Sequence, residues 1–367
     1  MRTSRLLRAP RTKRILVVRT DRLGDVILAT PLIRALRQTY PEAFLGAMVR
    51  PYTTHVLLHN PHLNEILIDD YEGEDKGRKG FWHRVRMLRK YKFDTALLLL
   101  PTQRAAWMLF FAGIPRRVGV GLKFYEALTF MKTVSRNKYV PLRHEADYCL
   151  DLGRKIGVRS DDLNTEIFLT AEERQNGRKI LSDAGVQDSD FLFGIHPESG
   201  GSSPNWAVER YVELAKKLLI RAPTDVRMVI TGKHRDTGFP RSERLIDLRG
   251  KLTLRQLISV IAQFRCLFSS STGPMHIAAA LKVPTLTMFC PLPACSPQLW
   301  GPKGNRARII VPPEGFCQGR CPGDPKVCQF DEITVEHALD AILSTVSKLR
   351  ADVSSNAEVS SQWTRND

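Results

Sequence analysis

The stretch that decides the fold is VVRTDRLGDVILATP, Val17–Pro31. An apolar strand pattern passes through a short polar loop into an apolar helical pattern, and Gly24 permits the tight turn between them. The loop places Asp21, Arg22 and Asp25 where the strand ends and must face water. Asp25 has two interpretations, a helix N-cap or a general base that accepts a proton from a substrate hydroxyl. One position can serve both roles, so both remain open.

Alternating strand and helix patterns extend outward from this unit. They predict a parallel sheet covered on both faces, and the pattern starts again after a polar stretch within 155–175. The expected strands are 15–19, 44–49, 65–68, 96–100, 191–196, 227–231, 266–269 and 285–289, and the expected helices are 26–38, 53–59, 80–91, 208–219, 254–263, 274–281 and 335–349.

The 367 residues therefore predict an α/β protein of two doubly wound, Rossmann-like domains. Ligands of such sheets bind beyond the carboxyl ends of the strands, so we expect the two domains to face a central cleft. The expected divisions are a basic N-terminal arm at 1–13, the first domain at 14–165, the second at 166–334, a C-terminal helix at 335–350 and a disordered tail at 351–367.

The charge balance favours an anionic partner. Lys and Arg number 55 against 38 Asp and Glu, for a formal charge of +17, which steers anions toward the protein. No window has the ~18 to 20 apolar residues that cross a bilayer, and the basic arm lacks the apolar core of a signal peptide. Seven cysteines, an odd number, are typical of reduced thiols. We therefore expect a cytoplasmic protein, soluble or peripheral at the inner membrane.

The loop GIHPESGGSSPNW, Gly194–Trp206, is suited to phosphate oxygens. Ser199 and Gly200 belong to a cluster of hydroxyls and backbone amides that follows a predicted strand. Such clusters are also ordinary loops, so phosphate contact is one of two interpretations.

A second anion-binding loop is predicted in FSSSTGPMHIAAALKVPTLTMF, Phe268–Phe289. A strand ends in serines, and a helix then begins at Gly273 and Pro274, where its free amides favour an anion. His276 in the first helical turn is either a structural hydrogen-bonding group or a contact for a diphosphate or a sugar.

Four segments in this order carry a resemblance to a known family: RTDRLGDVILATPLIRAL, IHPESG followed by NW, RGKLTL, and SSSTGPMHIAAALKVPTLTMFCP. Over residues 14–345 the chain resembles the ADP-heptose:lipopolysaccharide heptosyltransferases of glycosyltransferase family 9. The resemblance implies a GT-B fold, with an acceptor on the first domain and a nucleotide sugar, ADP-heptose, on the second. It implies sugar transfer with inversion and with neither a metal nor a cofactor beyond the nucleotide-sugar co-substrate.

Site residues follow from the same resemblance. Asp25 matches the proposed catalytic base, and Leu252 stands where the family packs an apolar side chain against the nucleotide base. The sequence departs from the family at Ser271, where an acidic residue is usual, and at Pro204, where a lysine is usual. Arg22, Lys233 or Arg235 is then expected to supply the missing cation. The implied donor-binding residues are Asp21, Arg22, Ser199, Gly200, Lys233, Leu252, Ser271, Thr272, Gly273 and His276.

The segment DKGRKGFWHRVRMLRKYK, Asp75–Lys92, is rich in Lys and Arg. It is either a solvated amphipathic helix or a surface for an anionic lipid-linked glycan and the anionic inner membrane. We expect Arg84, Arg104 and Arg116 to bind the acceptor, because the planar guanidinium suits phosphate and carboxylate. No nucleic-acid-binding signature is present, so nucleic acid is not an expected partner.

Three cysteines, Cys317, Cys321 and Cys328, lie close together near the end of the chain. A structural zinc site needs four ligands, and His337 is only a candidate for the fourth. Loop packing is therefore the preferred interpretation of the three thiols, with a metal site as the alternative. Cys149, Cys266, Cys290 and Cys295 are expected to be core or loop residues.

These observations predict an inverting, metal-independent heptosyltransferase that acts on lipopolysaccharide core or a related cell-surface glycan. One alternative is a related transferase that uses another nucleotide sugar, which Ser271 and Pro204 favour. The other is a non-catalytic GT-B protein that binds a glycan or nucleotide and assists assembly.

Overall fold

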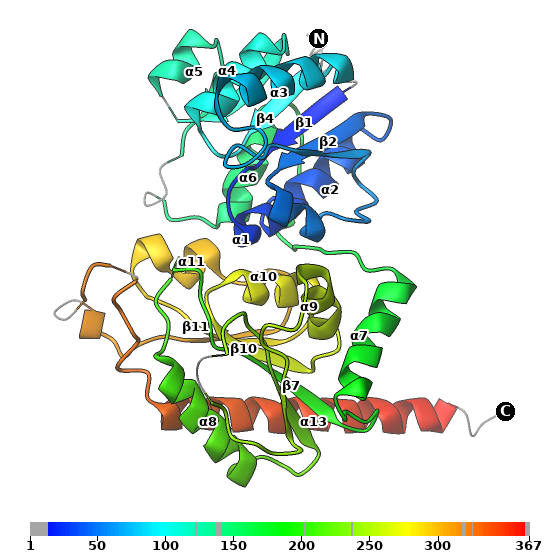
Figure 1. The fold of residues 1–367 in the computed structure, drawn as a ribbon, viewed down its shortest axis with the longest axis vertical. Helices are drawn as coiled ribbons and strands as arrows, with labels where there is room; N and C mark the ends of the chain where they lie inside the picture. The colour runs from blue at the N-terminus through cyan, green and yellow to red at the C-terminus, as the bar shows by residue number, and fades with distance from the viewer. Residues whose placement is uncertain are drawn as a thin grey trace, which may run out of the picture. The chain divides into compact units, whose positions relative to one another are not determined.

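The computed structural model describes residues 14–121, 123–136, 141–201, 203–235, 238–317, 321–324 and 326–363. The chain divides into two compact units, Met1–Phe168 and Leu169–Asp367 (Figure 1). The predicted basic arm at 1–13 lies outside the described residues. Each described helix is too short or too polar to cross a bilayer.

The first unit is built on one six-stranded parallel sheet with the order β3-β2-β1-β4-β5-β6. Strand β1 is the apolar run RILVV, which suits a strand that is covered on both faces. Its neighbours fix its register, because Val17 pairs with Ala47 on one side and with Leu97 on the other. The strands are β1 Arg14–Val18, β2 Phe44–Val49, β3 Glu65–Ile68, β4 Thr95–Leu98, β5 Arg116–Val120 and β6 Lys132–Val134; the helices are α1 Leu23–Ile27, α2 Thr30–Thr39, η1 Pro51–Val56, α3 Gly77–Tyr91, α4 Gln103–Phe111, α5 Phe124–Leu128 and α6 Glu145–Arg154.

The second unit repeats this plan with the order β12-β11-β10-β7-β8-β9, again parallel throughout. The long helix α13 packs beside α8, while α9 contacts α10 and α7. The strands are β7 Phe191–His196, β8 Val226–Ile230, β9 Leu245–Asp247, β10 Cys266–Ser270, β11 Thr285–Met288 and β12 Ala307–Ile310; the helices are α7 Ala171–Asp183, α8 Val208–Arg221, α9 Leu254–Ile261, α10 Gly273–Ala280, η2 Pro293–Cys295, α11 Pro297–Trp300 and α13 Val335–Trp363.

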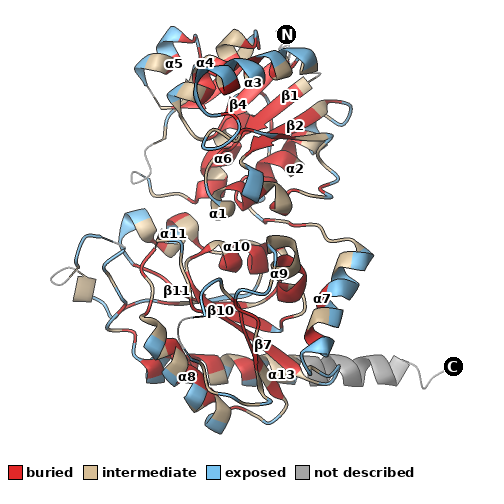
Figure 2. Ribbon diagram, viewed as in Figure 1, coloured by how far each residue is buried: buried red, intermediate tan, exposed pale blue. Residues whose placement is uncertain are grey.

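Both units bury their central strands, as the red strands of Figure 2 show. The prediction of an α/β protein with two doubly wound, Rossmann-like sheets is confirmed. In each sheet the order of connection reverses between two central neighbours, β1 and β4 in the first unit and β7 and β10 in the second. Open parallel sheets bind ligands beyond the carboxyl ends of the strands at such a reversal. The loops after these strands are therefore the expected ligand-binding loops of each unit.

The elements differ from the sequence prediction in a few places. The helix expected at 26–38 is two helices, α1 and α2, with the break at Leu28 and Ala29, because Pro31 has no N–H to continue the hydrogen-bond ladder to Ile27. The helix expected at 53–59 is the short 3-10 helix η1. Helix α13 continues to Trp363, into the segment expected as a disordered tail, since no Gly or Pro after 335 ends it.

Candidate functional site

Arg19 organises a buried ion network at the carboxyl end of β1. Its guanidinium donates to Asp21 Oδ1 at 2.9 Å and to Asp25 Oδ1 at 2.7 Å. It also donates twice to Glu145 Oε1, at 3.0 Å each. The Arg19 side chain is 4% exposed and that of Glu145 is fully buried, so neither charge is solvated by water. Each depends on its partners, and Arg136 adds a second cation to Glu145.

Asp25 is held in this network and is not a helix cap. The N-cap of α1 is Arg22, which lies three residues earlier and makes no side-chain cap bond. Asp25 instead sits in the first turn, where a negative charge is favourable, and its carboxylate turns toward Arg19. The N-cap interpretation is therefore wrong. The side chain keeps 17% of its surface exposed, so it combines a fixed orientation with access from solvent.

The carboxyl group of Asp21 has a pKa above its ordinary value. Burial raises the pKa of Asp21 to about 6, and the Asp25 charge adds to this effect while Arg19 opposes it. The Tyr52 hydroxyl donates to the Asp21 carbonyl oxygen at 3.2 Å, which joins η1 to the same loop. Arg22 between the two aspartates is exposed, and among the residues described it forms no ion pair.

Two of the three predicted acceptor arginines lie at this edge of the first sheet. Arg104 is the second residue of α4, and it pairs with Asp69, which follows β3, at 3.0 Å. Arg104 also donates to the Asp75 carbonyl oxygen, and Arg84 donates to the buried Asp75 carboxylate at 2.6 Å. Arg116, in contrast, is the first residue of β5. It lies at the amino end of the strand, on the opposite edge, so the topology does not bring it to Asp25.

In the second unit, a hydrogen bond between Ser203 and Ser271 joins the two loops that the sequence predicts as anion-binding. Ser203 Oγ donates to the Ser271 carbonyl oxygen at 2.5 Å, and Ser199 Oγ donates to the Ser203 carbonyl oxygen at 3.3 Å. The loop after β7, with Gly200, is thereby tied to the start of α10. The two loops meet because β7 and β10 are neighbours in the sheet.

The start of α10 offers free hydrogen-bonding capacity toward a ligand. Thr272 is its N-cap, is 6% exposed and makes no side-chain cap bond. Pro274 has no N–H, and the Met275 N–H donates to the Thr272 carbonyl oxygen at 3.1 Å. The Gly273 N–H is therefore the first-turn amide that forms no hydrogen bond within the described residues. His276, in the first turn, is buried. This arrangement suits an anion better than a cation.

Glu198 fixes the loop that carries Lys233, a role that the sequence analysis missed. Its carboxylate accepts from the backbone N–H of Lys233 at 2.8 Å and of His234 at 2.8 Å. Gly232 has φ +152°, and a Cβ there would lie 2.5 Å from Glu198 Oε1. A side chain at position 232 would be strained at this φ and would displace the Glu198 carboxylate. The Lys233 side chain is exposed at this edge.

The neighbouring strand ends complete this edge of the second unit. The Gly250 N–H donates to the Gly232 carbonyl oxygen at 2.8 Å, which brings the half-buried Leu252, just before α9, close to the Lys233 loop. A Cβ at Gly250 would contact the Arg235 side chain at 3.6 Å. His196 at the end of β7 hydrogen-bonds to Thr231 Oγ1 at 2.9 Å, and burial lowers its pKa to about 4. His196 is therefore a neutral structural group near pH 7.

Comparison with known proteins agrees with this picture. The model of glycosyltransferase family 9 (heptosyltransferase) matches residues 81–320. The chain belongs to glycosyltransferase family 9. Lipopolysaccharide heptosyltransferase 2 of Salmonella typhimurium is 27% identical to it over 312 residues, 81% of this chain and 87% of that protein. The family resemblance is thus confirmed, the protein is a glycosyltransferase, and the non-catalytic alternative is set aside.

Two solved structures share the fold. The family 9 glycosyl transferase of Veillonella parvula has a TM-score of 0.75 at 22% identity, covering 94% of this chain and 99% of that one. The ADP-heptose LPS heptosyltransferase II of E. coli has a TM-score of 0.73 at 22% identity, covering 91% and 99%. The GT-B class expected from the resemblance is confirmed.

Proposed function

We propose that this glycosyltransferase moves heptose from ADP-heptose to a lipopolysaccharide core or a related cell-surface glycan, with inversion and without a metal. Relatives that align with most of the chain are named lipopolysaccharide heptosyltransferases. The observation that carries the proposal is the Asp25 carboxylate, which Arg19 holds at the carboxyl edge of the first sheet while part of it stays open to solvent.

Asp25 acts as the general base in this mechanism. It takes the proton of the acceptor hydroxyl while the hydroxyl oxygen forms a bond to the anomeric carbon and the bond from that carbon to the diphosphate breaks. Attack opposite to the leaving group inverts the anomeric centre. General-base assistance contributes about 10² to 10⁴-fold to rate. The Arg19 guanidinium orients the carboxylate and is a positioning residue, because it does not reach solvent.

The second unit stabilises the departing diphosphate. The amide at Gly273 and the hydroxyl of Thr272 supply hydrogen bonds, and the exposed Lys233 supplies positive charge. Ser199 holds the neighbouring loop through its bond to the Ser203 carbonyl oxygen. One well-placed donor to a developing oxyanion is worth about 3 to 4 kcal/mol in known enzymes. Arg22 in the first unit is a further cation without an ion pair among the residues described, as a role at the donor phosphates requires.

The position of the acidic residues supports metal independence. The single Asp-x-Asp sequence is Asp188–Asp190, which precedes β7 and so lies at the amino edge of the second sheet. Asp190 there accepts from the Gln187 N–H and pairs with Arg227 at 3.2 Å. Its carboxylate stabilises the turn before β7, at the opposite end of that strand from the donor loops.

Contact with an anionic membrane surface is part of the proposal. Helix α3 carries basic residues and packs on α4, which contacts α5. Phe124 and Phe130 are 79% and 77% exposed and Trp82 is 38% exposed. Aromatic rings over basic residues are typical of proteins that sit at an anionic bilayer surface. The double variant Phe124→Ser, Phe130→Ser is expected to reduce co-sedimentation with anionic vesicles, and unchanged co-sedimentation would remove this face from the proposal.

A different nucleotide sugar is the second candidate, and two positions favour it. Ser271 stands where the family usually has an acidic residue for sugar hydroxyls, and its carbonyl oxygen is engaged by Ser203. Pro204 stands where a lysine is usual and is buried. These two positions fit a donor that presents fewer hydroxyls or less charge at these points than ADP-heptose does.

A transfer assay decides between the donors. The full chain is incubated with a heptose-free lipid-linked core acceptor and with ADP-heptose or other nucleotide sugars, and the product is analysed by mass spectrometry. A mass gain of one heptose that depends on Asp25 supports the proposal. Transfer from another nucleotide sugar alone selects the second candidate. A thermal-shift screen gives an independent ranking, because a donor that binds the folded state stabilises it by mass action.

A further inference from the structure

Glu145 holds the Arg19 guanidinium from helix α6. It is the first residue of α6, where a negative charge is favourable, and its side chain is fully buried. Its Oε1 accepts from both Nη1 and Nη2 of Arg19, at 3.0 Å each. One oxygen therefore occupies the edge between the two terminal nitrogens, and a planar guanidinium held on this edge cannot turn freely.

The remaining donors of Arg19 reach the two carboxylates that follow β1. Nε donates to Asp21 Oδ1 at 2.9 Å, and Nη2 donates to Asp25 Oδ1 at 2.7 Å. Nη2 is also one of the two nitrogens that bind Glu145. Because Nη2 carries two hydrogens, one can bond to Glu145 and the other to Asp25. The direction of the bond to Asp25 thus depends on the position of Glu145.

Arg136 holds Glu145 from a second direction. It follows β6, and its Nη2 donates to the same oxygen, Glu145 Oε1. Arg136 Nη1 donates at 3.2 Å to the carbonyl oxygen of Leu99, which follows β4, the neighbour of β1 in the sheet. The Arg136 Cζ also lies 5.5 Å from the centre of the Tyr148 ring on α6. Two cations therefore compensate this buried carboxylate and fix its place.

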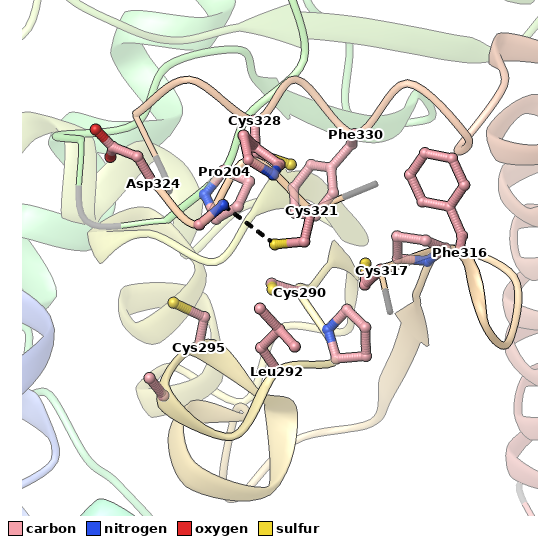
Figure 3. A pocket seen from close by; sticks show the side chains of 15 residues that line it. Pro204, Cys290, Leu292, Cys295, Phe316, Cys317, Cys321, Asp324, Cys328 and Phe330 are labelled. Carbon is pink, nitrogen blue, oxygen red and sulfur yellow. Dashed lines mark hydrogen bonds between the residues drawn. The ribbon is translucent and has the colours of Figure 1, made fainter. Parts of the chain in front are cut away.

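Cys149 on α6 adds a contact to Arg19 that carries no charge. Its Sγ accepts from Arg19 Nη1 at 3.6 Å, and burial raises the pKa of Cys149 to about 12, so the thiol is neutral near pH 7. Five of the seven cysteines instead line a cavity of about 240 Å³ in the second unit (Figure 3), namely Cys290, Cys295, Cys317, Cys321 and Cys328. The exposed His337 does not line this cavity, and among the described residues no three His, Cys, Asp or Glu side chains are grouped to hold a metal ion. The charge of Arg19 is therefore balanced by carboxylates and not by a thiolate.

We propose that Glu145 is a positioning residue for the proton transfer to Asp25, a role that rests on the proposed function. Its carboxylate fixes the Arg19 guanidinium, which in turn directs the Asp25 carboxylate. It also takes up part of the positive charge that Arg19 would otherwise exert on the two aspartates. A carboxylate beside an uncompensated cation accepts a proton less readily. Glu145 thus sets both where the base lies and how strongly it takes the proton.

The charges around Asp25 give the sign of the expected pH effect. Glu145→Gln removes one negative charge and leaves the other groups in place, so the remaining carboxylates ionise more readily and the acidic limb of the rate profile moves to lower pH. The ionisable groups around Asp25 are Arg19, Asp21 and Arg22 at and after the end of β1, Tyr52 on η1, and Glu145 on α6 with its partner Arg136.

Glu145→Gln tests the proposal, because glutamine keeps the length and an acceptor oxygen of the side chain but removes its charge. We expect kcat to fall by about 10 to 10²-fold, as it does when a reacting group is displaced. The KM for the donor should stay within about twofold of wild type. The acidic limb of kcat, measured between pH 5 and 9, should move to lower pH by about one unit.

Glu126→Gln is the matched control, because Glu126 is also a buried glutamate of the first unit. Its carboxylate accepts from the backbone N–H of Val120 at 3.2 Å and of Lys123 at 2.9 Å, at the start of α5. This role is structural, so Glu126→Gln should lower the free energy of unfolding in denaturant while kcat and its acidic limb stay close to wild type.

A double-mutant cycle with Asp25→Asn shows whether Glu145 acts through Asp25. In the Asp25→Asn background, Glu145→Gln should lower kcat further by less than about twofold, because the base that it positions is already absent. Single-turnover transfer followed by mass spectrometry measures the slow variants. If Glu145→Gln does not fold, Glu145→Asp takes its place in the cycle, because it keeps the charge that the two arginines need on a shorter side chain.

The contrary results are distinct from those that would reject the proposed function. A kcat of Glu145→Gln equal to that of Glu126→Gln overturns the inference, and so does an equal loss of kcat in the wild-type and Asp25→Asn backgrounds. Transfer of another sugar with the same dependence on Glu145 supports the inference and rejects only the proposed donor. Wild-type turnover by Asp25→Asn alone rejects the proposed base, and this inference with it.

Discussion

The two sheets have the same strand order, yet their carboxyl edges carry different chemistry. In the first unit, one buried arginine, Arg19, holds three carboxylates. In the second, a neutral His196 hydrogen-bonds to the Thr231 hydroxyl, and the carboxylate of Glu198 holds backbone N–H groups. Topology therefore sets where each half binds its ligand, and the residue types decide what is bound. One half is suited to take a proton and the other to hold an anion.

The largest expected effect is on kcat, and it tests whether the first unit supplies the proton acceptor. Asp25→Asn keeps the shape of the side chain but removes the proton acceptor, so kcat should fall by about 10² to 10⁴-fold. Asp183→Asn is the control, because that carboxylate forms an exposed pair with Lys179, and its kcat should stay close to wild type. Steady-state transfer rates with saturating donor and acceptor measure both. Turnover near the wild-type level in Asp25→Asn would remove this residue from the chemistry.

Stability should show the same contrast between buried and exposed charge. Arg19→Met leaves Asp21, Asp25 and Glu145 without their shared cation, which should cost about 3 to 5 kcal/mol of unfolding free energy. Arg221→Ala in the second unit breaks exposed pairs with Glu336 and Asp340 and should cost less than about 1 kcal/mol. Denaturant unfolding monitored by circular dichroism gives both values. Equal losses would mean that the network is no more important than a surface pair.

Donor affinity should depend mainly on the second unit. Glu198→Ala releases the Lys233 and His234 amides, each bonded to a charged acceptor, and bonds of that kind contribute about 1.5 to 3 kcal/mol. The KM for the donor should rise about tenfold or more, which corresponds to ~1.4 kcal/mol, while the KM for the acceptor stays unchanged. Glu209→Ala, an exposed residue on α8, is the matched control. A rise in acceptor KM instead would place Glu198 in a different role.

The two halves should also respond oppositely to pH. The pKa of His196 is lowered to about 4. Its contribution to the free energy of unfolding is therefore present above about pH 6.5 and is lost as pH falls toward 4. The pKa of Asp21 is raised to about 6. Its contribution to the free energy of unfolding is therefore present below about pH 4 and is lost as pH rises through 6.

Hydrogen exchange resolves these two changes by segment. Between pH 6 and 4, after correction for intrinsic exchange rates, the β7 segment should lose protection and the loop after β1 should gain it. His196→Asn should flatten the response of β7 and leave that of β1 unchanged. A common response in both segments would show that the titrations do not act locally.

Much of the fold could be predicted from the sequence because alternating apolar runs and helical patterns have distinct periods. The short strands β5, β6, β9 and β12 were missed, since three to five residues at or near a sheet edge carry little periodic signal. In the site, Asp25 and the loop Ser271–Gly273 follow strands and were found. Arg19 was not, because it ends an apolar run and its partner Glu145 is 126 residues away. Distance along the chain also hid the grouping of Cys290 with Cys328.

Donor binding by the Asp25→Asn variant tests the central claim most directly, because the variant should bind without turning over. Titration calorimetry with ADP-heptose, in the absence of acceptor, should give a dissociation constant within about twofold of wild type, as expected when only a transition-state contact is removed. Glu198→Ala, measured alongside, should bind about tenfold more weakly. A tenfold loss of donor affinity in Asp25→Asn, with normal affinity in Glu198→Ala, would contradict the division of roles between the two sheets.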